Sequence, residues 1–282
     1  MFILELLKSV LYGIVEGVTE WLPISSTGHL ILLEDIIPFS SVKPEFFSMF
    51  EVVIQLGAII AVILIFWTKL WPFKSNKSNE PGIKPYIKMN TLELWLKVVI
   101  ASLPAAIIGL PIDDWLDAHL YNKITVAIML IVYGVLFIVI EYRNKGKAPK
   151  INALKELNYS TAAIIGCFQV LAMIPGTSRS GATILGAILI GIRRPVAAEF
   201  SFFLAIPTMA GASFLKIVKY LNVGFTIQEI SILLVGMVVS FFVSLVAIKG
   251  LMSYVKRKDF SFFGYYRIVL GIIVLLFALI VG

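Results

Sequence analysis

GIVEGVTEWLPISSTGHLI, residues 13–31, places two carboxylates, a run of hydroxyls and a histidine inside an almost wholly apolar chain. Ionisable groups at membrane depth are costly, so a cluster of them predicts a functional site. A second polar stretch, PGTSRSGAT at 175–183, lies half a chain away and contributes an arginine. We expect the fold to be organised around these two stretches.

The composition is that of a membrane protein. Of the 282 residues, 59% are hydrophobic and 15% are charged, and the mean hydropathy is +0.95. Soluble domains carry about 25% charged residues, so this chain is expected to be an integral membrane protein. The net charge of +7 sits in short basic runs between apolar stretches, which membrane topology explains better than nucleic-acid binding. Cys167 is the single cysteine, which excludes an internal disulfide and a cysteine-based metal site.

Six apolar stretches are long enough to cross a bilayer, which takes about 20 residues of helix. They lie near 45–70, 91–111, 122–142, 195–218, 228–252 and 264–281. Two further apolar stretches, 2–37 and 159–191, are interrupted by Pro, Gly, Ser and Thr. Irregular backbone at membrane depth is tolerated only where it is buried in protein or lines a cavity. Both stretches are therefore predicted to be re-entrant helical hairpins, with ordinary kinked spans as the alternative.

The two halves of the chain, approximately 2–142 and 159–281, resemble each other. Gly13, Glu16, Pro23, Ser25 and Ser26 fall opposite Gly166, Gln169, Pro175, Thr177 and Ser178, with a one-residue slip. Each half is then a hairpin followed by three spans, and an odd number of crossings inverts the second copy. The predicted fold is an all-α integral membrane protein, a single membrane domain over 1–282. It has six transmembrane helices plus two re-entrant hairpins in an inverted-topology repeat, which brings the hairpins together near the midplane.

Basic residues predict the orientation of this fold. They gather in the loops 69–88, 143–155, 193–194 and 256–258, which all fall on one side of the six-span arrangement. By the positive-inside rule these loops are cytoplasmic and both termini lie outside.

Glu16 and Glu20 are four residues apart, so they share one face of a helix. Two carboxylates on a buried face need a cation or a shared proton, which suits general acid or base work or the binding of Mg²⁺ or Ca²⁺. A solvated face at the hairpin mouth is the alternative. Glu5 lies earlier on the same helix and is expected to be solvated.

Ser25, Ser26, Thr27 and His29 follow Pro23 where a new helix begins. Helix capping explains one of these hydroxyls but does not require three in a row followed by a histidine. The unpaired N–H groups of a helix N-terminus favour phosphate. A hydroxyl with an imidazole and a carboxylate near it can act as an activated nucleophile.

Arg179 supplies the cation of the second stretch. A guanidinium in apolar surroundings needs an anionic partner, and its planar fork matches phosphate oxygens. Pairing with Glu16 or Glu20 alone is the alternative, and both hold in turn if the ion pair opens when substrate arrives. The residues expected to contact phosphate are Ser25, Thr27, Ser178, Ser180 and Thr183.

Two weaker groups of residues complete the candidates. Glu51 and Gln55 share a face of the first full span, where they line a cavity or make interhelical hydrogen bonds. Gly181, Gly186 and Gly191 form a small-residue face that suits packing within one chain or between copies in a homo-oligomer.

Four motifs carry a resemblance to a known family: GIVEGVTEWLPISSTGH (13–29), FEVVIQLGAIIAV (50–62), PGTSRSGAT (175–183) and EFSFFLAIPTMAGA (199–212). In this order and spacing they closely resemble the bacterial undecaprenyl-diphosphatases, also called bacitracin-resistance proteins. The resemblance covers nearly the whole chain. It implies hydrolysis of undecaprenyl diphosphate to undecaprenyl phosphate and inorganic phosphate, which recycles the lipid carrier for peptidoglycan synthesis. It also implies a divalent cation and an active site on the outer face of the bacterial inner membrane.

Matched motif by motif, the resemblance implies that Glu16, Glu20, Ser26, His29 and Arg179 form the catalytic group. Ser26 is then the nucleophile, with His29 as the alternative for attack or for proton transfer. A polyprenyl-phosphate transporter or flippase is the rival function, since inverted repeats with broken helices are typical of transporters. Such a protein uses the same anion-binding cluster and needs no nucleophile, so the adjacent hydroxyls and histidine favour the enzyme.

Overall fold

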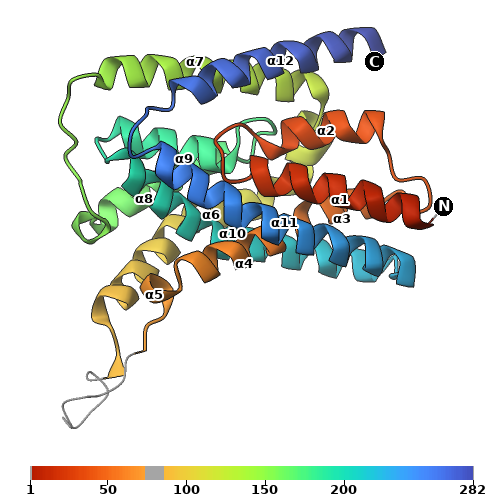
Figure 1. The fold of residues 1–282 in the computed structure, drawn as a ribbon, viewed down its shortest axis with the longest axis horizontal. Helices are drawn as coiled ribbons and strands as arrows, with labels where there is room; N and C mark the ends of the chain where they lie inside the picture. Colours follow the sequence, from red (N-terminus) through yellow and green to blue (C-terminus); the bar gives the residue numbers. More distant parts are fainter. Residues whose placement is uncertain (1, 74–85, 282) are drawn as a thin grey trace.

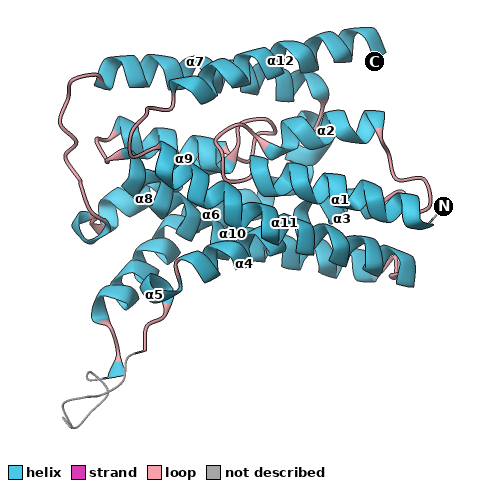
Figure 2. Ribbon diagram, viewed as in Figure 1, coloured by secondary structure: helices cyan, strands magenta, loops and turns pink. Residues whose placement is uncertain are grey.

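The structure, a computed structural model, describes residues 2–73 and 86–281, which are almost entirely helical (Figures 1 and 2). These residues contain two isolated β-bridges and no strand. Lys74, Lys77 and Lys84 of the basic loop 69–88 lie outside the described residues. The helices are α1 (Phe2–Thr19), α2 (Ser26–Ile36), α3 (Phe46–Val53), α4 (Gln55–Ile65), α5 (Trp67–Leu70), α6 (Met89–Leu120), α7 (Lys123–Asn144), α8 (Tyr159–Leu171), α9 (Arg179–Leu189), α10 (Arg194–Leu221), α11 (Ile227–Tyr254) and α12 (Ser261–Val281).

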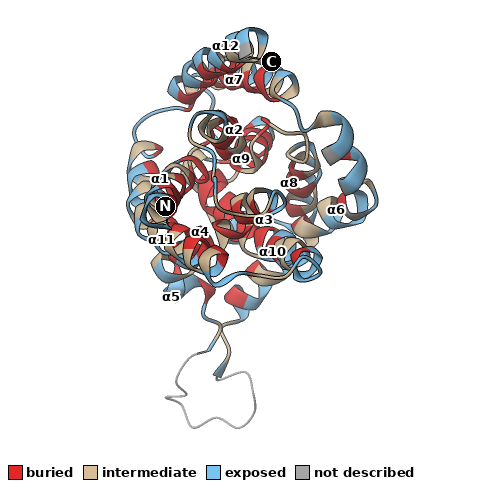
Figure 3. Ribbon diagram, turned by 90° about the vertical axis from the view of Figure 1, so that its right-hand side faces the viewer, coloured by how far each residue is buried: buried red, intermediate tan, exposed pale blue. Residues whose placement is uncertain are grey.

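Within the described residues, six helical segments are long and apolar enough to cross a membrane. They are Phe46–Ile65, Met89–Gly109, Lys123–Asn144, Arg194–Leu221, Ile227–Tyr254 and Ser261–Ile280. The six predicted spans are thus confirmed. Large apolar side chains such as Ile107, Val246 and Val269 point outward, as contact with lipid requires. Figure 3 shows exposed residues on the outer faces of α6, α7, α11 and α12, and buried residues around α9.

Two spans differ in detail from the prediction. The first is divided into α3, α4 and α5, with breaks at Ile54 and Phe66. At the first break Gly57 N bonds to Ile54 O over 3.1 Å, a three-residue step that tightens the turn. The second span, α6, runs beyond the predicted end at 111 and continues to Leu120. Pro104 and Pro111 lie inside this helix and do not end it.

Each of the two interrupted stretches forms a helical hairpin. The end of α2 returns to the start of α1, where Tyr12 OH donates to Ile37 O over 3.2 Å and Lys8 Nζ to Pro38 O over 2.6 Å. The backbone after α9 likewise returns to the segment before α8, where Lys150 N donates to Gly191 O over 2.8 Å. The tips are the turns 20–25 and 172–178. Membrane insertion of these hairpins from one side stays a prediction.

The prediction of a solvated Glu5 is wrong. Glu5 is 2% exposed, and one of its carboxylate oxygens accepts from Lys8 Nζ over 3.0 Å. The return of α2 to the start of α1 covers this pair. Burial of the carboxylate is tolerated because its charge is matched within the same helix.

Close helix contacts tie each hairpin to a span of the other half of the chain. Gly13 of α1 lies against Gly236 O of α11, and Gly166 of α8 lies against Ala101 O of α6. A Cβ at Gly13 or Gly166 would stand 2.6 or 2.3 Å from these oxygens, so only glycine permits the approach. In lipid the hydrophobic effect does not drive helices together, because the lipid tails are as apolar as the side chains. Close contacts at small residues therefore stabilise these helix pairs.

The small-residue face of α9 is used inside the chain. Gly181 and Gly186 are buried, and Gly186 lies against the ring of Phe168 on α8. Gly191 follows the helix with φ of +93° and turns the chain toward Lys150. These glycines therefore explain packing within one copy, and a homo-oligomer stays a prediction.

Candidate active site

Ser25 and Ser178 end the two hairpin tips in the same unusual conformation. Their φ angles are 72° and 70°, and they are the described non-glycine residues with positive φ. Each caps the next helix: Ser25 Oγ accepts from Gly28 N and Ser178 Oγ from Gly181 N. The strain, about 1–3 kcal/mol each, is tolerated where the surroundings fix the backbone. The caps pair Ser25 with Ser178, one residue away from the predicted pairing of Ser26 with Ser178.

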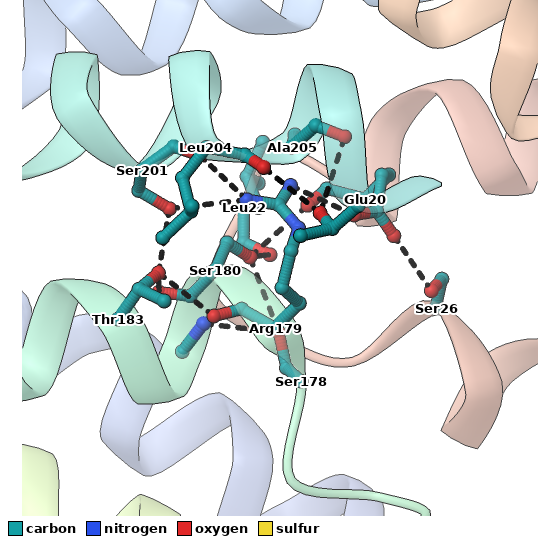
Figure 4. Close-up of polar contacts among 12 residues, drawn as sticks. Glu20, Leu22, Ser26, Ser178, Arg179, Ser180, Thr183, Ser201, Leu204 and Ala205 are labelled. Carbon is teal, nitrogen blue, oxygen red and sulfur yellow. Dashed lines mark hydrogen bonds and ion pairs between the residues drawn. The ribbon is translucent and has the colours of Figure 1, made fainter. Parts of the chain in front are cut away.

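The two tips meet through Glu20 and Arg179. Glu20 Oε1 accepts from Arg179 Nη2 over 2.9 Å, and Glu20 Oε2 accepts from Ser26 Oγ over 3.0 Å (Figure 4). Ser180 Oγ adds a bond to the backbone oxygen of Glu20 over 3.0 Å. The structure thus brings together Glu20, Ser26 and Arg179 as predicted, in a largely buried network.

Arg179 is also held from the side of α10. Its Nη1 donates to Ser201 O over 2.7 Å and to Ser201 Oγ over 3.2 Å. Ser201 Oγ in turn bonds to Thr183 Oγ1 over 2.7 Å, as Figure 4 shows. The guanidinium lies 5.7 Å from the ring centre of Trp21. Both ends of the fork are therefore positioned before any ligand binds.

Arg267 of α12 is a second guanidinium at the tips, which the sequence motifs do not single out. It is fully buried and donates to Pro23 O over 3.1 Å, to Gly176 O over 2.7 Å and to Thr177 O over 2.9 Å. These oxygens belong to both hairpin tips, so Arg267 joins the two tips. The available signal was a single arginine inside an otherwise apolar span.

The comparison with known proteins identifies the family to which this arrangement belongs. The family described as "Bacitracin resistance protein BacA" matches residues 9–273, nearly the whole chain. The chain belongs to the BacA bacitracin-resistance family.

Several relatives in the BacA family are similar over almost their full length. One from Acetivibrio thermocellus is 60% identical over 278 residues, covering 99% of both chains. One from Enterococcus faecalis is 57% identical and covers 98% of both. One from Desulfitobacterium hafniense is 54% identical over 98% of this chain and 97% of its own. All three carry the name undecaprenyl-diphosphatase.

Glu16, on the last turn of α1 and four residues before Glu20, differs from the other buried carboxylates in the described part of this BacA-family chain. It is fully buried, and neither carboxylate oxygen has a hydrogen-bond partner in the described residues. Such a group needs a proton or a cation. Hard oxygen donors of this kind fit Mg²⁺ or Ca²⁺, and Mg²⁺ is often held by one or two carboxylates plus substrate phosphates. The described residues contain no group of three His, Cys, Asp or Glu side chains placed for a metal.

His29 is not placed beside the Ser26 hydroxyl as a simple proton acceptor. Its Nδ1 lies 2.7 Å from Ser25 O, and its Nε2 lies 2.8 Å from Tyr266 OH on α12. The Nδ1 proton therefore points at the carbonyl, and Nε2 accepts from the tyrosine. In this structure the partner of the Ser26 hydroxyl is Glu20, so Glu20 takes the place that the sequence suggested for the imidazole.

Most of the hydroxyls predicted to contact phosphate make bonds within the protein. Ser25 and Ser178 cap helices, and Ser180 and Thr183 brace Glu20 and Arg179. Thr27 is half-buried on the first turn of α2. These residues shape the tips, and their direct contact with phosphate stays a prediction.

A cavity of about 640 Å³ leads to Arg179. Its walls come from α3, α6, the end of α8 and the second half of α10. Glu51 lines it, as predicted, and accepts from Tyr121 OH over 2.7 Å. Gln55, the first residue of α4, is not among the lining residues found in the described chain. The cavity gives a ligand a route to the meeting point of the tips.

Proposed function

We propose that this chain is a membrane phosphatase that hydrolyses undecaprenyl diphosphate to undecaprenyl phosphate and inorganic phosphate. The observation that carries the proposal is the contact of Ser26, Glu20 and Arg179 at the tips of two hairpins. It puts a hydroxyl, a carboxylate and a phosphate-binding guanidinium together. The names of the relatives support the same substrate. The reaction returns the lipid carrier for peptidoglycan synthesis.

In the proposed reaction, the terminal phosphate enters beside Arg179. The guanidinium exchanges Glu20 for phosphate oxygens, which match its fork and release the carboxylate as a base. Ser26 Oγ attacks the terminal phosphorus as the bond to the bridging oxygen breaks. The hydroxyl proton moves to Glu20 Oε2, which lies 3.0 Å away, and then to the departing lipid phosphate.

Water completes the turnover at the phosphorylated Ser26. The oxygen of the attacking water bonds to phosphorus as the Oγ–P bond breaks, and one proton of the water moves to Ser26 Oγ. Arg179 and the N–H groups at the start of α2 stabilise the charge that develops on phosphate. His29, oriented by Ser25 O and Tyr266 OH, lies on the same first turn of α2 as Ser26 and is a second candidate for proton transfer.

We further propose that Glu16, together with Glu20, holds a divalent cation, Mg²⁺ or Ca²⁺. When bound, the cation supplies Lewis-acid stabilisation of phosphate charge. The unpartnered buried oxygens of Glu16 support this assignment.

The proposed location is the bacterial inner membrane, with the active site facing outside. By the positive-inside rule, the basic loops support a cytoplasmic location for their side, which would put the start of α3 and the end of α10 at the outer side. Glu51, near the start of the first span (Phe46–Ile65), and Lys216, near the end of α10, line the cavity. Their position supports a substrate route from the outer leaflet. Re-entrant hairpins in inverted repeats are part of this proposal, supported by the matching caps at Ser25 and Ser178.

Purified protein in detergent, given a polyprenyl diphosphate, tests the function. Release of inorganic phosphate without any membrane gradient is the expected result, with Ser231→Ala as a variant outside the site. A protein that binds the lipid diphosphate but releases no phosphate would contradict the enzyme and favour the rival transporter. Movement of a fluorescent polyprenyl phosphate between vesicle leaflets would then test that function.

A further inference from the structure

Gln169, two residues before the end of α8, carries a buried side-chain amide without a hydrogen-bond partner among the described residues. Its side chain is 3% exposed, and both Oε1 and Nε2 are without a hydrogen-bond partner in the part of the chain described. Buried amides are nearly always hydrogen-bonded, because an unpaired amide has lost its bonds to water without replacement. Such a group beside a cavity indicates a ligand.

The cavity of about 640 Å³ is lined by Gln169 and by Arg179. Both Nη atoms of Arg179 are bonded, to Ser201 and to Glu20, but its Nε has no partner in the described residues. Gln169 Nε2 and Arg179 Nε are therefore two buried, unpaired donors in residues that line one cavity. A charged donor and a neutral donor together fit an anionic oxygen group such as phosphate.

The rest of the wall is mostly apolar and includes Ala106, Met173 and Pro207. A cavity with apolar walls and a few polar groups at one place fixes the orientation of a ligand. Its volume is within the range of about 300–1,000 Å³ usual for small-ligand sites, which suits a phosphate with its first isoprene units.

We infer that Gln169 is a substrate-binding residue whose Nε2 donates to a phosphate oxygen of the polyprenyl lipid, beside Arg179. The inference rests on the proposed function for the identity of the lipid. This role accounts for the glutamine at the position that corresponds to Glu16 in the other half of the chain. Glu16 offers oxygens to a cation, and Gln169 offers N–H groups to the anion.

Gln169→Leu tests this, since leucine keeps most of the volume and removes both polar atoms. The KM for polyprenyl diphosphate is expected to rise about tenfold, with kcat changed by less than about threefold. The Tm in detergent should stay equal or rise, because an unpaired buried amide is replaced by hydrocarbon. Gln169→Glu should raise KM further by placing a negative charge against the phosphate.

Ser231→Ala is the control. Ser231 lies on α11 outside the cavity, and its hydroxyl donates to Ile227 O over 2.8 Å, so KM should not change. A Gln169→Leu variant with wild-type KM, or one that loses Tm without a change in KM, would overturn the inference.

Binding of farnesyl monophosphate, followed by calorimetry, separates this inference from the proposed function. The wild-type protein should bind it, and Gln169→Leu should bind about tenfold more weakly. Equal affinities would overturn the role of Gln169. Normal binding by a wild-type protein that hydrolyses no diphosphate would instead contradict the phosphatase and leave the role of Gln169 in place.

Discussion

Glu20 and Arg179 lie 159 positions apart in the chain and form a largely buried ion pair of 2.9 Å where two hairpin tips meet. Neither hairpin could bury its charged residue alone, because an unpaired buried charge costs several kcal/mol. The pair therefore fixes the contact between the halves of the chain. The same ion pair positions the guanidinium and the carboxylate that the proposed reaction uses.

Arg179→Lys keeps the positive charge but cannot reach Glu20 and Ser201 with a rigid fork. We expect kcat/KM for phosphate release to fall about 100-fold, the effect of losing one or two charge-assisted hydrogen bonds. Arg257→Lys, on an exposed loop, is the control. Wild-type turnover in Arg179→Lys would remove the fork from the mechanism.

Ser26→Ala removes the proposed nucleophile and leaves Glu20 and Arg179 in place. Phosphate release should fall roughly 1,000-fold or more, since nucleophile removal leaves only binding and charge stabilisation. The assay is phosphate release in detergent at saturating substrate. Substantial activity in this variant would favour direct attack by water or by His29.

Glu16→Gln keeps the size of the side chain and removes its charge. Chelation with EDTA should stop phosphate release by the wild-type protein, and added Mg²⁺ or Ca²⁺ should restore it. In Glu16→Gln the cation concentration at half-maximal activity should rise about tenfold or more, since one charged ligand is lost. Glu45→Gln, at an exposed position, should match the wild type. An unchanged cation requirement in Glu16→Gln would separate Glu16 from the metal.

Arg267→Met leaves three carbonyl oxygens of the hairpin tips without their donor. We expect the free energy of unfolding to fall by about 3 kcal/mol or more, since each buried carbonyl left without its donor costs about 1–3 kcal/mol. Thermal unfolding in detergent measures this, and activity should fall with stability. Arg257→Met tests the loss of an exposed arginine. An Arg267→Met protein with wild-type stability and reduced activity would contradict the stabilising role and show that the bonds of Arg267 serve catalysis alone.

Hydropathy and local breaks made much of the fold predictable. Spans are contiguous in the sequence, so about 20 apolar residues identify each of them. The tips were visible because Pro, Gly and Ser gather there, and the charge of Arg179 required a partner such as Glu20. These inferences use only neighbours in the chain or the rule that buried charges are paired.

The remaining features depend on contacts between distant residues. Arg267 binds backbone oxygens at Pro23 and Gly176, and no property of those residue types announces such a donor. The partner of His29, Tyr266, comes from α12 and was equally invisible. Glu5 was expected in solvent because its burial depends on how α2 returns to α1. Sequence patterns predicted which groups needed partners, but only the fold selected them.

A double-mutant cycle on Glu20 and Arg179 tests the central claim that the joined tips form one catalytic unit. Glu20→Gln, Arg179→Gln and the double variant are compared by kcat/KM for phosphate release from a polyprenyl diphosphate. The account predicts that the double variant loses about as much activity as the worse single variant, since residues acting as a unit are not additive. Losses that multiply, or single variants with wild-type activity, would contradict it.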